Sequence, residues 1–97
     1  MDIEFDDNRL DRLETQADLT AGHGPAVDRA FRKVMQALRA ALDERDLYKG
    51  GLRFEKLKGN RKGERSVRLN DQWRLLLEIR GKGSQKRIAV IRIEDYH

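Results

Sequence analysis

The fold of this chain is indicated by a change of hydrophobic period between two stretches. Residues 25–42 read PAVDRAFRKVMQALRAAL, and residues 73–80 read WRLLLEIR. In the first stretch apolar side chains recur at the spacing of one face of an α-helix. In the second, every second side chain from Trp73 to Ile79 is apolar, which is the spacing of one face of a β-strand. The sequence therefore predicts helices followed by a sheet, with the change of period after Gly50-Gly51.

The first half is predicted to contain one strand and two helices. Ile3 and Phe5 alternate with acidic residues in a short first strand. Asp7 is suited to cap a short helix, and Pro25 to begin the long one, because proline is tolerated in the first helical turn. The apolar face of the long helix is expected to be buried, and its members are Val27, Ala30, Phe31, Val34, Met35, Leu38, Ala41 and Leu42.

The second half is predicted to be a β-meander. Strands are expected at residues 52–57, 64–69 and 73–80. A last strand includes residues 88–91, which are apolar on both faces, as in a central strand that is covered on each side. Because the strands are segregated from the helices, we predict an α+β fold. It consists of a short N-terminal strand, two helices and an antiparallel meander, with the helices packed on one face of the sheet.

Composition limits the class of protein. A chain of 97 residues has the size of one domain, so residues 1–97 are expected to form a single unit. The sequence has no cysteine and only two histidines, which argues against a metal site and excludes a cysteine nucleophile. No apolar run is long enough to cross a membrane, and the acidic start does not resemble a signal peptide. We therefore expect a cytoplasmic protein that needs neither metal nor cofactor.

Charge is distributed unevenly along the chain. Residues 1–44 contain six Arg or Lys and ten Asp or Glu, whereas residues 45–97 contain fifteen and seven, so the two halves carry −4 and +8. A basic half of this kind can present a cationic face to a polyanion such as nucleic acid. A solvated basic surface without a partner is the alternative that charge alone leaves open.

Two arginines are predicted to share the sheet face that the helices leave uncovered. Strand alternation directs Arg74 away from Trp73, and it places Arg68 out of phase with Val67. Guanidinium groups bind phosphate through two parallel hydrogen bonds, a geometry that also suits the extra charge of a pentacoordinate transition state. Exposed strands carry arginine for solubility as well, so this second interpretation stays open.

The chain ends on Glu94-Asp95-Tyr96-His97, which combines carboxylates, a phenol and an imidazole. An imidazole has an unperturbed pKa of about 6.5, so His97 is suited to proton transfer near neutral pH. Beside a cationic surface this ending indicates phosphodiester chemistry on a nucleic acid, and a frayed chain end is the alternative.

The other histidine and the single tryptophan are given structural interpretations. His23 lies in a glycine-bounded segment of the first half, and it is expected to be exposed to solvent. Trp73 is in phase with Leu75 and Leu77, so it is expected in the core rather than as a platform for base stacking.

Three separated blocks of the second half resemble one protein family. They are residues 57–63 (LKGNRKG), residues 66–74 (SVRLNDQWR) and the closing residues 94–97 (EDYH). In this order, and after a strand and two helices, they resemble the HigB branch of the RelE/ParE toxins over essentially the whole chain. The resemblance implies a ribosome-dependent mRNA endonuclease of a type II toxin–antitoxin system, which inhibits growth. It also implies three partners: a cognate HigA-like antitoxin with a helix-turn-helix, the ribosome and mRNA.

The resemblance also implies site residues by position. Lys58 and Arg74 correspond to basic residues of the cleavage site. Some HigB toxins have histidine where this chain has Glu55, so Glu55 either accepts a proton or only pairs with a neighbouring cation. The candidate catalytic residues are Glu55, Lys58, Arg74, Asp95, Tyr96 and His97, and the candidate RNA-binding residues are Arg61, Lys62, Arg65 and Arg68.

Cleavage of RNA requires removal of the 2′-hydroxyl proton, stabilisation of charge on the phosphate and protonation of the departing 5′-oxygen. Lys58 and Arg74 would hold the phosphate, with Arg68 as a third candidate. His97 would transfer a proton, and Asp95 would orient or charge it. Strand parity places Asp95 and His97 on one side and Tyr96 on the other, so Tyr96 either stacks on a base or closes the core.

Two functions without nuclease activity stay open. A ParE-like toxin would use the same fold to bind a protein target, and the terminal cluster argues against it. A plain RNA-binding module would need only the basic sheet, so the ending Asp95-Tyr96-His97 would be unnecessary.

Overall fold

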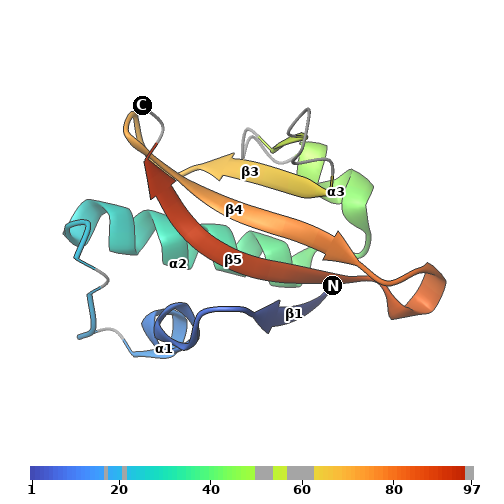
Figure 1. The fold of residues 1–97 in the computed structure, drawn as a ribbon, viewed down its shortest axis with the longest axis horizontal. Coiled ribbons are helices and arrows are strands. Elements are labelled where there is room, and N and C mark those ends of the chain that lie inside the picture. Colours follow the sequence, from blue (N-terminus) through green and yellow to red (C-terminus); the bar gives the residue numbers. More distant parts are fainter. Residues whose placement is uncertain (17, 21, 50–53, 57–62, 96–97) are drawn as a thin grey trace.

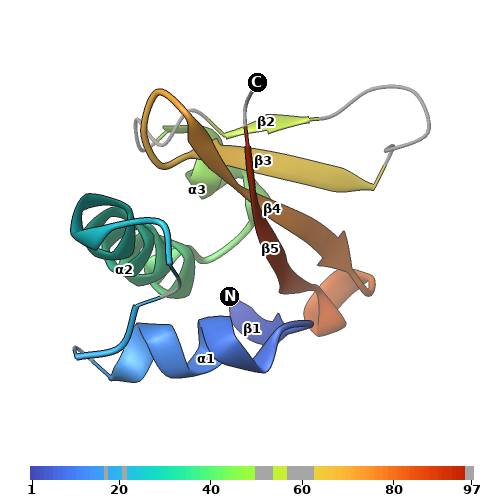
Figure 2. The ribbon, with the colours of Figure 1, turned by 60° about the vertical axis from the view of Figure 1, so that its left-hand side comes forward.

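The computed structural model of the 97-residue chain describes residues 1–16, 18–20, 22–49, 54–56 and 63–95. Within these ranges the strands form one mixed sheet in the order β1-β5-β4-β3-β2. The edge strand β1 runs parallel to β5, and the other neighbours are antiparallel. The elements, labelled in Figure 1 and Figure 2 except for the 3₁₀ turn, are β1 (Asp2–Phe5), α1 (Asn8–Thr15), α2 (Pro25–Ala40), α3 (Glu44–Lys49), β2 (Glu55–Lys56), β3 (Glu64–Arg68), β4 (Trp73–Arg80), a 3₁₀ turn (Gly83–Gln85) and β5 (Arg87–Asp95). The predicted α+β class is confirmed.

The two predicted helices begin where the sequence indicated. Asp7 caps α1, because its side chain accepts a hydrogen bond of 2.9 Å from the backbone N–H of Arg9. Pro25 occupies the first turn of α2. The guanidinium of Arg32 on α2 donates to backbone carbonyls at and beyond the end of α1, those of Leu13, Gln16 and Leu19, at 2.9, 3.0 and 3.1 Å. This arginine therefore ties the C-terminal end of α1 to α2.

The structure corrects the predicted end of α2. The helix stops at Ala40, because Ala41 adopts an extended backbone conformation with ψ of 135°. Ala41 still turns into the core, but Leu42 is 90% exposed, so its predicted burial is wrong. A third helix, α3, follows and buries Leu47. This helix was not predicted, since one buried side chain in six residues produces no helical period.

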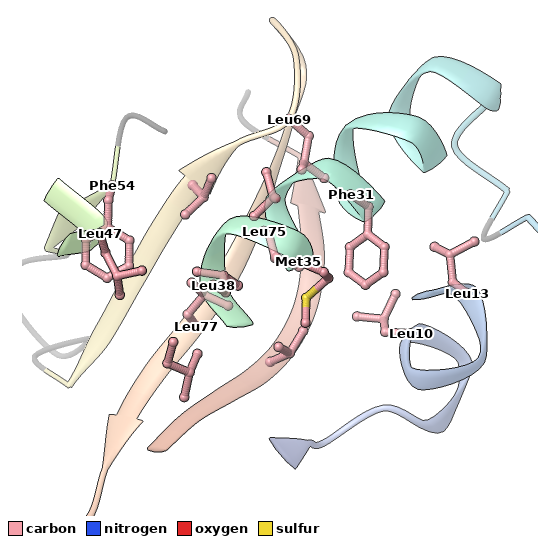
Figure 3. Packing of buried hydrophobic residues seen from close by; sticks show 14 of the residues in the cluster. Leu10, Leu13, Phe31, Met35, Leu38, Leu47, Phe54, Leu69, Leu75 and Leu77 are labelled. Atoms are coloured by element: carbon pink, nitrogen blue, oxygen red, sulfur yellow. The ribbon is translucent and has the colours of Figure 1, made fainter. Parts of the chain in front are cut away.

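The hydrophobic core lies between the helices and one face of the sheet. Figure 2 shows α2 on one side of β3, β4 and β5, and Figure 3 shows side chains from the helices facing those of the strands. The predicted packing of helices on one sheet face is confirmed. The fully buried members are Leu13, Val27, Phe31, Met35, Leu38, Leu47, Val67, Leu75, Leu77, Ile88 and Val90. Trp73 packs against this cluster as a partly buried residue, as predicted.

A bulge in β5 decides which side chains reach the other face. The pairing between β4 and β5 shifts between Leu76 and Leu77, whose partners are Arg92 and Val90. The extra residue, Ile91, lets Val90 and Ile93 both contact the core although they are three positions apart. As a consequence, Arg92 and Glu94 lie on the face opposite the helices.

The predicted strand at residues 52–57 is represented by β2, which is the edge strand next to β3. Among the described helices, none is both long enough and apolar enough to span a membrane.

Candidate nucleic-acid interface and active site

The sheet face that the described helices do not cover carries a row of three charged residues at the C-terminal end of β5. Arg68 on β3 is paired in register with Arg74 on β4, and Arg74 is paired with Glu94 on β5. Residues paired across antiparallel strands share a face, so the predicted common surface of the two arginines is confirmed. Both arginines are half-buried, with their charged groups on this face rather than in the core.

The carboxylate of Glu94 lies between two guanidinium groups. Its Oε2 accepts a hydrogen bond of 2.8 Å from Nη2 of Arg74, and its Oε1 lies 3.3 Å from Nη2 of Arg92. The Arg74 side chain is 18% exposed and that of Glu94 is 26% exposed, so this ion pair is shielded from water more than an ordinary surface pair. We call Arg74, Arg92 and Glu94 the arginine–glutamate triad.

Asp95 lies at the same end of the sheet, but in phase with the other face. Its register partner on β4 is Trp73, and Nε2 of Gln72 donates to its Oδ2 at 3.4 Å. His23 packs its ring against Trp73 in an edge-on contact with a centroid distance of 4.4 Å. The prediction that His23 is exposed is therefore wrong, because the segment before α2 returns to the end of the sheet. Within the described part of the chain, the strand end thus gathers Asp95, Trp73 and His23 on one side and the triad on the other.

Glu55 is an exposed residue on the same face as Arg68. It is paired with Ser66, which lies two residues before Arg68 on β3, and Ser66 is paired in turn with Leu76. Ser66 and Leu76 are both buried although they lie on the face without helices. The carboxylate of Glu55 on the edge strand β2 therefore lies on the same face as Arg68 and Arg74.

Arg65 is not part of this surface. It points to the helical face, where its Nη2 lies 3.3 Å from Oε2 of Glu44 on α3 and its side chain is only 14% exposed. The hydroxyl of Tyr48 donates to the same Glu44 oxygen at 3.4 Å, and the pKa of Tyr48 is raised above its usual value, mainly by burial. Of the candidate RNA-binding residues, the structure thus separates Arg65 from Arg68. The candidates Lys58, Arg61, Lys62, Tyr96 and His97 lie outside the described residues.

A second group of arginines lies at the other end of the same face. Arg80 binds three carboxylates, those of Glu4, Asp6 and Glu78, at 2.6 to 2.8 Å, and Arg87 also pairs with Glu4. Hydrogen bonds from Arg80, and for Glu4 also from Arg87, lower the pKa values of Glu4 and Asp6. These arginines are neutralised by acids, and they hold the edge strand β1 on the sheet.

Sequence reasoning missed Glu94 and Arg92 as members of the site. Residues 92–94 alternate as Arg, Ile and Glu, which places both charged residues on one face. That pattern was readable, but which face they occupy depends on the bulge at Ile91.

The fold of this chain is similar to the folds of solved structures. The chain is similar to a YoeB/ParE toxin from Agrobacterium tumefaciens, with 19% identity, a TM-score of 0.64 and complete coverage of both chains. It is also similar to YafQ from Escherichia coli, with 18% identity, a TM-score of 0.55, and coverage of 98% of this chain and 92% of that one. At these identities the likeness establishes the fold, which is that of the RelE-like toxins.

The sequence itself establishes the family. Residues 3–97 match the family described as RelE-like toxin of type II toxin–antitoxin system HigB, so the chain belongs to this family. No significant match was found among curated proteins. The resemblance inferred from the three sequence blocks is confirmed.

Proposed function

We propose that this toxin is an endoribonuclease that cuts mRNA on translating ribosomes in the cytoplasm, and that residues 1–97 act as one domain. The observation that carries this proposal is the pairing of Arg68 with Arg74 on the uncovered sheet face, at the end where β5 finishes. Two guanidiniums facing the same way can hold the oxygens of one phosphate. The chain continues from Asp95 to Tyr96 and His97, which bring the acid–base groups that this chemistry needs.

The proposed reaction is transfer of a phosphodiester to the neighbouring 2′-hydroxyl. A base removes the 2′-hydroxyl proton, the 2′-oxygen bonds to phosphorus, and the bond to the 5′-oxygen breaks as that oxygen is protonated. The products are a 2′,3′-cyclic phosphate and a 5′-hydroxyl. Arg68 and Arg74, with Lys58, stabilise the charge that develops on the phosphate. His97 transfers a proton, and Asp95 orients it from the same strand end, although Asp95 itself is in phase with the other face. Glu55, which lies on the same face as Arg68, is the second candidate for proton transfer.

The ribosome supplies what a small surface lacks. The proposed cleavage face is small, and one small face is not expected to organise the RNA substrate and complete the acid–base chemistry alone. We therefore expect slow cleavage of naked RNA and fast cleavage of mRNA held in the decoding region.

The experiment is to mix the purified toxin with ribosomes programmed with a defined mRNA, and to map the new 5′ ends. Mapping transcript ends in cells after a brief induction provides the same information in vivo. The proposal predicts cuts in translated regions and few cuts in the same RNA without ribosomes. Efficient cleavage of naked RNA would remove the ribosome requirement. Growth arrest without any RNA cleavage would favour a ParE-like action on a protein target.

Membership of a toxin–antitoxin family leads us to propose an antitoxin as partner. We expect a separate HigA-like polypeptide with a helix-turn-helix that binds the toxin and restores growth when the two are expressed together. Failure of every neighbouring gene product to bind or neutralise the toxin would count against this partner.

A further inference from the structure

We propose that Glu94 is a positioning residue of the cleavage site, which holds the guanidiniums of Arg74 and Arg92 in place for the phosphate. This inference rests on the proposed function and extends it to two residues outside the candidate set. Glu94 itself touches no reacting atom in this account, because its role is to orient Arg74.

The geometry points to Glu94 because one carboxylate bridges two arginines with separate oxygens. Oε2 accepts from Arg74 on the neighbouring strand, and Oε1 accepts from Arg92 two residues away on the same strand. Each contact uses one Nη2 group, and a guanidinium carries five N–H donors, so Glu94 does not occupy all the donors of either arginine. A long arginine side chain otherwise has many rotamers, and fixing it in advance lowers the entropic cost of binding the transition state.

The balance of charge explains why the arginine–glutamate triad contains two arginines. A single Arg–Glu pair would be neutral and would attract a phosphate weakly. The arginine–glutamate triad keeps a net charge of +1, and Arg68 adds another positive charge beside Arg74. Glu94 can therefore hold Arg74 without cancelling the attraction for RNA, provided that Arg92 shares the carboxylate.

The test compares Glu94→Ala and Glu94→Gln with the wild-type toxin in single-turnover cleavage on programmed ribosomes. Toxin concentration is varied, so that the maximal rate and the half-saturating concentration are obtained separately. Glu78→Gln is the matched control. Glu78 lies on the same face, also pairs with an arginine, and has 34% side-chain exposure, but it is at the far end of the sheet.

The proposal predicts a split between the two kinetic quantities. Glu94→Ala should lower the maximal rate roughly 10-fold to 100-fold, since a misplaced group costs about that much. The half-saturating concentration should stay the same or fall, because a negative charge has been removed beside the RNA. Glu94→Gln should be intermediate, since its amide offers one acceptor oxygen in place of two. Glu78→Gln should keep the parental maximal rate.

A readout independent of activity is the NMR signal of the Arg74 Nε–H group in the toxin without RNA. Glu94→Ala should broaden or shift it, and Glu78→Gln should leave it unchanged. If both Glu94 variants cut at the parental maximal rate, this inference fails while the proposed function stands. If the wild-type toxin cuts no mRNA, the proposed function fails and this inference fails with it. Thermal melting identifies any variant that is unfolded. If Glu94→Ala is unfolded, Glu94→Gln still tests the proposal.

Discussion

Arg68 and Arg74 are direct cross-strand neighbours on β3 and β4, and their side chains lie on the same face of the sheet. Like charges placed opposite one another weaken a strand pair rather than stabilise it. An anion bound by both guanidiniums would offset this repulsion. The acidic residue on the other side of Arg74 is Glu94, whose contact of 2.8 Å keeps the local charge partly balanced before RNA arrives.

Replacing either arginine should reduce cleavage without unfolding the toxin. We expect Arg74→Ala to lower the single-turnover rate roughly 100-fold to 1,000-fold, the usual cost of losing one donor to a developing negative charge. Binding should also become less sensitive to salt, because fewer counterions are released. Arg68→Ala should behave similarly but less severely. Arg45→Ala is the control, since Arg45 lies on α3, its side chain is 87% exposed, and it is not one of the candidate site residues.

A melting measurement accompanies this series. Arg74→Ala should lower the free energy of unfolding by about 1–3 kcal/mol, because it removes a hydrogen bond to a partly buried carboxylate, and both site variants should still melt cooperatively. If Arg74→Ala cleaves at the parental rate under the same conditions, Arg74 does not bind the reacting phosphate.

The sequence predicted the surface better than it predicted the site. Period-2 alternation was sufficient to place Arg68 and Arg74 together, because a strand has only two faces. It was not sufficient for Glu94 and Asp95, because their faces depend on the bulge at Ile91. Nothing in a hydrophobic pattern marks a bulge among residues that are apolar on both faces.

Contacts between residues far apart in the sequence were also not predictable from the local pattern. His23 contacts Trp73 from fifty residues away in sequence, and β1 pairs with β5 from opposite ends of the chain. Such contacts arise from the packing of α1 and α2 on the sheet rather than from the residues next to them. The helices themselves were predictable, since Asp7 and Pro25 are local start signals.

Arg32 should be a stabilising residue, because it joins two helices through three backbone carbonyls. We expect Arg32→Ala to lower the free energy of unfolding by about 1–2 kcal/mol, given the strength of hydrogen bonds to charged groups at a partly exposed site. The melting temperature should fall by about 4–8 °C per kcal/mol. Arg29→Ala on the same helix is the control, because Arg29 is exposed. Equal melting of the two variants would show that the contacts to α1 add nothing.

The acids around Arg80 should make the toxin sensitive to acid. The pKa values of Glu4 and Asp6 are lowered in the fold by hydrogen bonds from Arg80, with Arg87 also acting on Glu4. A depressed folded pKa stabilises the fold above the unfolded value of about 4, and that contribution is lost as pH falls through the folded pKa. Melting temperature should therefore drop more steeply below about pH 5 in the wild type than in Arg80→Gln. Identical pH profiles for both proteins would exclude this contribution.

The strongest test of the proposed chemistry is the removal of the last residue. Deleting His97 should lower cleavage on programmed ribosomes roughly 100-fold to 10,000-fold, the usual contribution of a positioned proton-transfer group. The melting temperature should hardly change, since the core is built from helix and sheet residues such as Phe31, Leu38 and Leu75. Ribosome binding should be retained, because the arginines that attract RNA are untouched.

A second variant, His97→Gln, separates the imidazole from the chain end. It keeps the length and the position of the terminal carboxylate but removes the group that titrates near neutral pH. Both variants should lose rate together, and both should flatten the pH dependence between about pH 5.5 and 7.5. If both cut at the parental rate, the proton transfers belong to Glu55 or Asp95. The same series in an Asp95→Asn background then distinguishes these two, since only a dependence on Asp95 would lower the remaining activity.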